Sequence, residues 1–291
     1  MKVSNRWYGF LLNVPGLLVV FLWVVFPAVL LVSISFLRYD NLHPVIFTGI
    51  DNYLKMFRDR LFLVSLRQVA LFSLGTTVLT FFIGLGLAMA LSGVRRGSAL
   101  FRSLMTMPWA VPAIVSGIIW KWMFQPDFGV ISDLLMKVGF ISEPLSIYSN
   151  PTMAMIGVII ADSWTRIPFM GVILLAALLS IAKELYEAAR IDGTSAFQRF
   201  MFISLPLIRG PMFVGLLITI MFSFRTIDII IPLTAGGPGR STYVFGYFLY
   251  DQLVKTLNFG VGAAAGMFLF LLTGVISSVM LYLSRGPLDA R

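Results

Sequence analysis

Six apolar segments, each long enough to cross a lipid bilayer, constrain the fold of this chain more than any other feature. A helix needs about 20 consecutive apolar residues to span the hydrocarbon core. Because 58% of the 291 residues are hydrophobic and only 12% are charged, one soluble core cannot bury the apolar surface. We therefore predict an all-α polytopic membrane protein with six transmembrane helices in a single domain. The predicted spans are residues 10–36, 69–91, 103–124, 152–181, 211–232 and 259–283.

The segments that flank the spans indicate how the chain is oriented. Residues 10–36 are too long for the apolar part of a signal peptide and no small-residue cleavage site follows them, so we expect them to remain as the first span. An even number of spans places both termini on one side of the membrane. The loop 94–102 holds three arginines in nine residues, and short basic loops stay in the cytoplasm. We expect cytoplasmic termini and an amphipathic surface helix at 51–68 in the first outer loop.

The composition excludes several kinds of chemistry. Cysteine is absent and His43 is the only histidine, so thiolate chemistry is excluded, and neither a metal site nor histidine acid–base catalysis is expected. The net charge of +9 is spread along the chain without the basic patch that nucleic-acid binding requires. No phosphate-binding loop of the form GxxxxGK followed by Ser or Thr is present. We expect no enzymatic activity, no bound cofactor and no nucleic-acid partner.

The longest polar insertion lies at 183–206, between the fourth and fifth predicted spans. Its first nine residues are mostly good helix formers, and Gly193 is placed to end that helix. Ser195 with Gln198 three residues later resembles a capping box for a second short helix, which Pro206 limits. The residues alone leave two interpretations open. The insertion is either an interfacial helix that anchors the bundle or a docking hairpin that transmits force from a soluble partner.

One motif in this insertion resembles the EAA motif of permease subunits in bacterial ABC importers, and its position before the fifth span also matches. The motif residues are Glu187, Ala188, Ala189, Gly193, Ile203, Leu205 and Pro206. Three further segments, 39–53, 107–112 and 233–238, are similar to the carbohydrate permeases of the MalF and UgpA type. With the six-span layout, the resemblance covers nearly the whole chain.

The resemblance implies a fold, a function and a set of partners. It implies a type I ABC importer permease that passes a carbohydrate or a carbohydrate-like solute. The implied partners are a second homologous permease, two ATP-binding subunits that hold ATP and Mg²⁺, an extracytoplasmic solute-binding protein and membrane lipid. The implied location is the cytoplasmic membrane of a bacterium or archaeon. Residues expected at the contact with the ATP-binding subunit are Glu187, Ala188, Ala189, Asp192, Gly193, Leu205 and Pro206.

Charged side chains inside two predicted spans indicate a polar cavity. Asp162 and Arg166 are four residues apart, and Arg225 and Asp228 are three apart, so each pair can share a helix face. Charges at such depth face protein or water, and the similar depths favour one shared cavity. Two interpretations stay open: each pair neutralises itself as structural support, or the group lines a sugar path. The predicted path residues are Asp162, Trp164, Arg166, Ser223, Arg225, Thr226 and Asp228.

Some features leave alternatives. Trp109, Trp120 and Trp122 fit either a binding site or the membrane interface. The turn-rich loop 234–243 either reaches an outer binding protein or only connects two spans. A self-contained secondary carrier is an alternative function, but such carriers often contain inverted repeats, and we find none. An ATP-driven permease is the hypothesis that also gives the hairpin a purpose.

Overall fold

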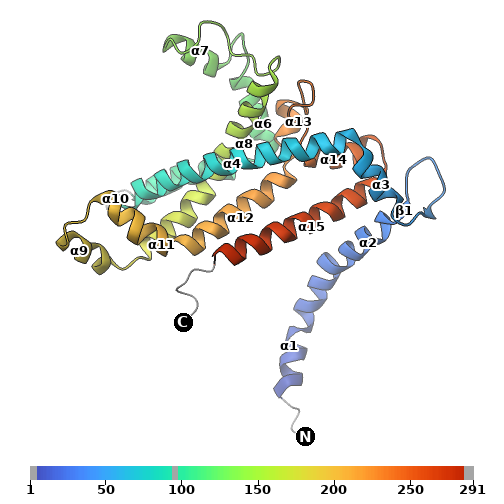
Figure 1. The fold of residues 1–291 in the computed structure, drawn as a ribbon, viewed down its shortest axis with the longest axis horizontal. Helices are drawn as coiled ribbons and strands as arrows, with labels where there is room; N and C mark the ends of the chain where they lie inside the picture. Colours follow the sequence, from blue (N-terminus) through green and yellow to red (C-terminus); the bar gives the residue numbers. More distant parts are fainter. Residues whose placement is uncertain (1–4, 94–97, 285–291) are drawn as a thin grey trace. The chain divides into compact units, whose positions relative to one another are not determined.

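The computed structural model describes residues 5–93 and 98–284, and it is almost entirely helical (Figure 1). The predicted all-α class is confirmed. Residues 94–97, part of the basic loop used above for orientation, lie outside the described residues. Contacts divide the chain into two compact units, Met1–Phe62 with Leu249–Leu271 and Leu63–Phe248 with Leu272–Arg291.

The first unit begins with a long apolar helix. Three elements follow one another without a break: α1 (Asn5–Val20), the π-helical turn η1 (Phe21–Val25) and α2 (Phe26–Ser35). The segment Phe10–Ser35 is long and apolar enough to cross a membrane, and its most apolar stretch has no buried residue. An apolar surface of this size needs a cover of lipid or of another protein chain.

The end of α2 is held by a small polar network. The remaining elements of this unit are β1 (Leu37–Arg38), its antiparallel partner β2 (Ile46–Phe47), α3 (Asp51–Arg58), η3 (Asp251–Lys255) and the first part of α15 (Phe259–Ser284). Asn52 is buried and donates from Nδ2 to the carbonyls of Ser35 at 2.9 Å and of Leu37 at 2.7 Å. The N–H of Gly260 donates to the carbonyl of Tyr39 at 3.0 Å. These bonds join segments far apart in the sequence.

The prediction of a surface helix at 51–68 followed by a span at 69–91 is wrong in its boundary. The structure ends α3 at Arg58 and begins α4 (Arg60–Ser92), a helix of 33 residues, directly afterwards. Asp59 has an extended backbone, and its carboxylate accepts the N–H of Leu61 at 2.7 Å. This is the geometry of an N-cap. The cap starts the second span nine residues before the apolar run does.

The predicted span 103–124 is broken in its middle. It consists of α5 (Ser98–Ala110) and α6 (Ala113–Met123), which meet at an angle of 93°. Pro112 lies at the break and has an extended backbone (φ −56°, ψ 137°). Proline lacks an N–H and disfavours a helical conformation in the residue before it. The fold therefore turns sharply where the sequence predicted a continuous helix.

The predicted span 211–232 is also shorter than expected. Helix α12 (Arg209–Arg225) ends where Thr226 becomes extended, and α13 (Ile230–Leu233) follows after a short turn. A 71° bend separates α12 from the helical segment Ala196–Leu207. By length and composition, the described ranges contain four unbroken spans, or up to six if each bent pair counts as one. Besides Phe10–Ser35 and α4, the unbroken spans are α8 (Pro151–Leu179), in which Pro168 causes no break, and α15.

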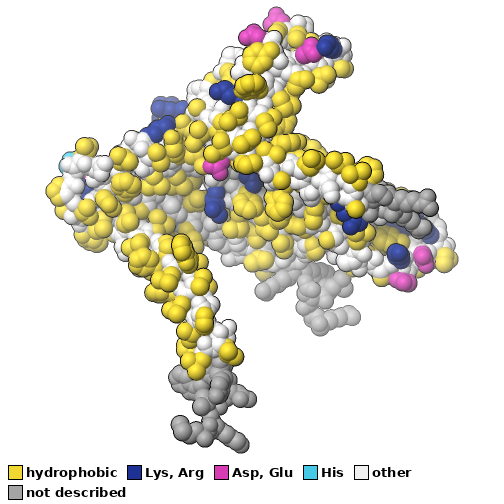
Figure 2. Space-filling view, turned by 180° about the vertical axis from the view of Figure 1, so that it is seen from behind, with side chains coloured by type: hydrophobic (Ala, Val, Ile, Leu, Met, Phe, Trp, Pro, Cys, Tyr) yellow, Lys and Arg dark blue, Asp and Glu magenta, His cyan; other side chains and the backbone are white. Residues whose placement is uncertain are grey.

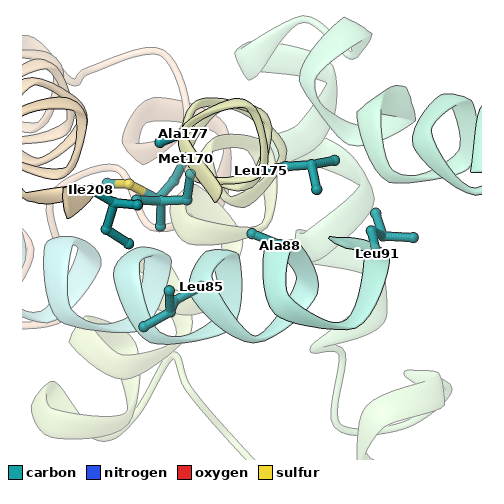
Figure 3. Close-up of a cluster of buried hydrophobic side chains, with 8 residues drawn as sticks. Leu85, Ala88, Leu91, Met170, Leu175, Ala177 and Ile208 are labelled. Atoms are coloured by element: carbon teal, nitrogen blue, oxygen red, sulfur yellow. The ribbon is translucent and has the colours of Figure 1, made fainter. Parts of the chain in front are cut away.

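The second unit is built around α4, α8 and α12, which run beside one another (Figure 1). Figure 3 shows the buried cluster that joins them, with Leu85 and Ala88 from α4, Met170 from α8 and Ile208 from the turn before α12. A Cβ on Gly84 would lie 3.2 Å from the backbone nitrogen of Gly171, so α4 and α8 approach closely. Outside the core, hydrophobic side chains cover most of the face that Figure 2 presents, as expected for contact with lipid.

Short helices connect the longer ones. The polar insertion folds as α9 (Lys183–Ile191), α10 (Ala196–Arg199), the π-helical turn η2 (Phe200–Ser204) and α11 (Leu205–Leu207). These four elements lie at the end of α8 (Figure 1), and we call them the hairpin. Two further short helices are α7 (Val130–Lys137) and α14 (Phe245–Tyr250).

Candidate functional site

A polar cavity of about 400 Å³ opens inside the second unit, at the break between α5 and α6 and beside α8 and the end of α12. We call it the central cavity. Its volume is within the range of small-molecule sites, about 300–1,000 Å³. Five of the seven predicted path residues line it. The lining consists of Trp109, Val111, Ala113, Asp162, Thr165, Arg166, Phe169, Thr219, Phe222, Arg225, Thr226 and Asp228.

Asp162 and Arg166 form an ion pair on one face of α8, as the sequence predicted. The guanidinium of Arg166 reaches the carboxylate with Nε at 2.5 Å and Nη2 at 2.9 Å. Nη2 also donates to Oγ1 of Thr226, the residue that follows α12, at 2.7 Å. The side chains of the pair are 4% and 17% exposed. Because both charges are satisfied within the protein, this pair fits the structural interpretation, and it ties α8 to the end of α12.

Arg225 and Asp228 do not form the predicted pair. A helical i,i+3 contact requires a continuous helix, and α12 ends at Arg225. The backbone of Thr226 lies against α14, where a Cβ on Gly246 would be 2.5 Å from the carbonyl oxygen of Thr226. No ion pair joins Arg225 to Asp228, although both are described residues, and both are exposed and line the central cavity. These two side chains can therefore offer hydrogen bonds to a solute.

Two predicted path residues face elsewhere. Ser223 is fully buried, and its hydroxyl donates to the carbonyl of Thr219 at 2.9 Å. Trp164 packs edge-on against Trp120, with ring centroids 6.1 Å apart and planes at 73°. Their assignment to the cavity lining was wrong because one residue along a helix turns the side chain by about 100°.

The aromatic wall of the central cavity consists of Trp109, for which the sequence left a binding site open, and of Phe169 and Phe222, which the sequence did not indicate. Trp109 lies 6.1 Å from Phe169 between ring centroids, and the guanidinium of Arg166 lies 5.5 Å from the centre of the Phe222 ring. A spacing signal was present in the sequence. From Asp162, the lining residues of α8 follow at i+3, i+4 and i+7, which is one face of a helix.

The hairpin has a well-defined turn after α9. Gly193 has φ +73° and donates its N–H to the carbonyl of Arg190 at 3.1 Å, while the N–H of Thr194 bonds to the carbonyl of Ala189 at 3.1 Å. These two bonds define a Schellman motif, which ends a helix with a left-handed residue. The predicted capping box is confirmed, since Ser195 and Gln198 each accept the other's backbone N–H at 3.2 and 2.7 Å.

The predicted hairpin residues differ in exposure. Glu187, Ala188, Asp192, Gly193 and Pro206 are exposed, Leu205 is half-buried and Ala189 is buried. The sequence did not single out the apolar part of this surface. Ile191 is 87% exposed and Phe197 is 69% exposed, on either side of the Gly193 turn. Large apolar side chains presented by a short polar hairpin are typical of a protein contact.

Helices long and apolar enough to span a membrane, a polar cavity and an exposed hairpin are the arrangement expected of a transport permease. Residues 81–287 match the family described as "Binding-protein-dependent transport system inner membrane component". The chain belongs to this family. The resemblance drawn from the hairpin and the outer segments is therefore confirmed at the level of the family.

Individual proteins are similar over nearly their whole length. The trehalose/maltose transport system permease protein MalF of Thermococcus litoralis is 34% identical over 287 residues, 98% of this chain and 96% of that protein. The sulfoquinovosyl glycerol transport system permease protein SmoG of Agrobacterium fabrum is 31% identical, covering 98% and 92%. A crystal structure of a bacterial alginate ABC transporter with a pentasaccharide-bound periplasmic protein has a TM-score of 0.82 at 20% identity, covering 99% and 97%. The predicted permease fold is confirmed.

Proposed function

We propose that this permease forms the path for a carbohydrate or carbohydrate-like solute in an ATP-driven importer, and that an extracytoplasmic binding protein delivers the solute. The observation that carries this proposal is the central cavity, in which the unpaired side chains of Arg225 and Asp228 lie among aromatic rings. Sugars are recognised by hydrogen bonds from planar polar groups and by aromatic faces against the C–H surface of the ring. The names of the similar permeases also point to sugars.

The charges of the central cavity support a solute without a strong net charge. Asp162 and Asp228 balance Arg166 and Arg225. The pair between Asp162 and Arg166 keeps those two groups engaged with each other. Trp109, Phe169 and Phe222 supply the ring-binding surface. Small-molecule sites usually combine an apolar lining with a few well-placed polar groups, and the central cavity contains both kinds of side chain.

Energy enters through the hairpin in this proposal. The chain pairs with a second homologous permease, and two ATP-binding subunits hold ATP and Mg²⁺ and grip the hairpins in the cytoplasm. The exposed Ile191 and Phe197 supply an apolar contact, and the Schellman turn at Gly193 fixes their position. This orientation places both termini in the cytoplasm and the protein in the cytoplasmic membrane of a bacterium or archaeon.

Uptake into proteoliposomes that contain the full set of subunits tests the role of the cavity. Probe solutes are trehalose and maltose, with the anionic sulfoquinovosyl glycerol as the charged comparison, and each is first tested for binding to the cognate binding protein. Arg225→Ala should lower ATP-driven uptake about 10- to 100-fold, because a hydrogen bond to a charged group contributes about 1.5–3 kcal/mol. The matched control is Arg67→Ala, which removes an exposed arginine of α4 outside the central cavity. Uptake that survives Arg225→Ala at the wild-type rate would exclude the cavity as the path.

Co-purification tests the role of the hairpin. Glu187→Arg and Ile191→Asp should leave the permease in the membrane and weaken retention of the ATP-binding subunit at least tenfold, since a buried contact residue at an interface contributes about 2 kcal/mol or more. Glu143→Arg makes the same charge change at an exposed position far from the hairpin in sequence and is the control. Normal retention in both hairpin variants would refute the coupling role. ATP depletion with intact ion gradients should abolish uptake in the wild type.

A further inference from the structure

A second hollow, of about 460 Å³, lies between the hairpin and the adjacent ends of α4 and α8. We call it the hairpin basin. One part of its lining is apolar and comes from helix ends and from η2. We call this apolar part the floor of the basin, and it consists of Met89, Leu178, Leu179, Ile181 and Phe200. The other part is polar and comes mostly from α9 and α10, so the basin has an apolar side and a polar side.

The polar side of the basin is electropositive. Lys183 and Arg190 are exposed and Arg199 is half-buried, while Glu187 is the only carboxylate among the described residues that line the basin. No ion pair connects Glu187 to these cations, all of which are described residues. Three cations against one carboxylate leave a net positive charge, which attracts an anion.

The walls of the basin are joined by hydrogen bonds. Lys183, Glu187 and Arg190 follow one another at i, i+4 and i+7, so they occupy one face of α9. The hydroxyls of Tyr186 and Ser204 are 2.8 Å apart and join α9 to η2. Arg199 donates to the carbonyl of Thr194 within the turn. The basin is therefore formed without an ion inside it.

We propose that the hairpin basin binds an anionic phospholipid, with the phosphate among Lys183, Arg190 and Arg199 and an acyl chain over the apolar floor. Basic pockets between transmembrane helices on the cytoplasmic side suit anionic headgroups. A free phosphate would satisfy the cations but would leave the apolar floor uncovered. This proposal rests on the proposed function in one respect, because the cytoplasmic position of the hairpin sets the basin against the inner leaflet.

Native mass spectrometry of the intact transporter complex in detergent tests this inference. Dioleoyl phosphatidylglycerol is titrated against dioleoyl phosphatidylcholine, which has the same chains without the net charge, and sodium phosphate is the competitor. The wild type should retain phosphatidylglycerol at least tenfold more tightly than phosphatidylcholine. Lys183→Gln/Arg190→Gln should weaken its binding by roughly 30-fold, which is about 2 kcal/mol at about 1 kcal/mol per cation. Arg102→Gln removes an exposed arginine outside the basin and should have no effect.

A gain-of-binding variant separates lost binding from a misfolded hairpin. Glu187→Gln removes the carboxylate that the described lining of the basin contains and should strengthen phosphatidylglycerol binding about fivefold. The proposal is overturned if the double variant binds phosphatidylglycerol as tightly as the wild type does, or if the wild type binds phosphatidylcholine equally well. It is also overturned if free phosphate binds as tightly as phosphatidylglycerol and displaces it. Lipid binding is measured without ATP or solute. A failure of lipid binding would therefore count against the basin proposal alone, and a failure of uptake would count against the proposed function alone.

Discussion

The ion pair between Asp162 and Arg166 should contribute mainly to stability. In Asp162→Asn the guanidinium loses the carboxylate at 2.5 and 2.9 Å, and it keeps the hydroxyl of Thr226 at 2.7 Å and the ring of Phe222. Removing one partner of a buried pair costs about 3–5 kcal/mol. Arg166 is 17% exposed and keeps one hydrogen-bond partner, so we expect about 3 kcal/mol. For a unit of about 200 residues, each kcal/mol lowers Tm by about 2–4 °C, which gives a decrease of roughly 6–12 °C.

Thermal unfolding of the assembled complex, followed by tryptophan fluorescence, measures this decrease. The double variant Asp162→Asn/Arg166→Gln leaves no buried charge and should recover most of the lost stability. The matched control is Asp133→Asn, which breaks an exposed i,i+4 pair with Lys137 at 2.6 Å and should lower Tm by less than about 2 °C. The single variant Arg166→Gln completes the comparison. The ion pair would not stabilise the fold as we infer if Asp162→Asn lowered Tm no more than this control. The same would follow if the decreases in Tm of Asp162→Asn and Arg166→Gln simply added in the double variant.

Three further predictions concern local conformation and packing. Gly193→Ala should destabilise the hairpin by about 1–2 kcal/mol because φ is +73° there. The control Gly86→Ala lies in α4 with no atom within 4 Å of the new Cβ, so it should be neutral or stabilising by up to about 1 kcal/mol. Equal shifts of Tm in the two variants would contradict the turn geometry. Gly117→Ala should cost about 1–3 kcal/mol in a denaturation series, since its Cβ would lie 2.5 Å from Cγ of Pro232; an unchanged Tm would refute the close contact of α6 with α13. Burial raises the pKa of Tyr148, so the difference titration between wild type and Tyr148→Phe should have its midpoint above 10.0, and a midpoint at or below that value would contradict the burial.

The parts of the fold that depend on neighbours in sequence could be predicted. The hairpin turn follows from Gly193, Ser195 and Gln198, whose preferred conformations depend on residues at most four positions away. The ion pair within α8 was predicted for the same reason, since a continuous helix fixes the distance between residues four apart. The hairpin turn and the ion pair could therefore both be predicted from interactions between residues close in sequence.

The parts that depend on tertiary packing could not be predicted. Pro112 breaks a span by 93° whereas Pro168 lies inside α8 without a break. Both residues have the same local preference, and the difference lies in the packing around α6, where Gly117 allows close contact with α13. The same holds for Arg225, whose helix ends because the next backbone segment packs against α14. A sequence pattern shows which residues are polar but not where a neighbouring backbone forces a turn.

The connection between hairpin and cavity follows from the chain itself. Helix α8 carries Phe169 into the central cavity and ends at Leu179, just before the hairpin, and α12 starts just after the hairpin and carries Thr219 into the same cavity. Each helix covers roughly 15 Å between hairpin and cavity, from the helical rise of 1.5 Å per residue.

Between these two levels Met170 is fully buried, with atoms 2.9 Å from a Cβ built on Gly84 and 2.9 Å from one built on Gly215. Close-packed side chains of this kind resist compression. In the proposed function a displacement of the hairpin should therefore move α8 and α12 as stiff bodies, and the proposed transmission would use this apolar packing rather than a chain of polar contacts between hairpin and cavity.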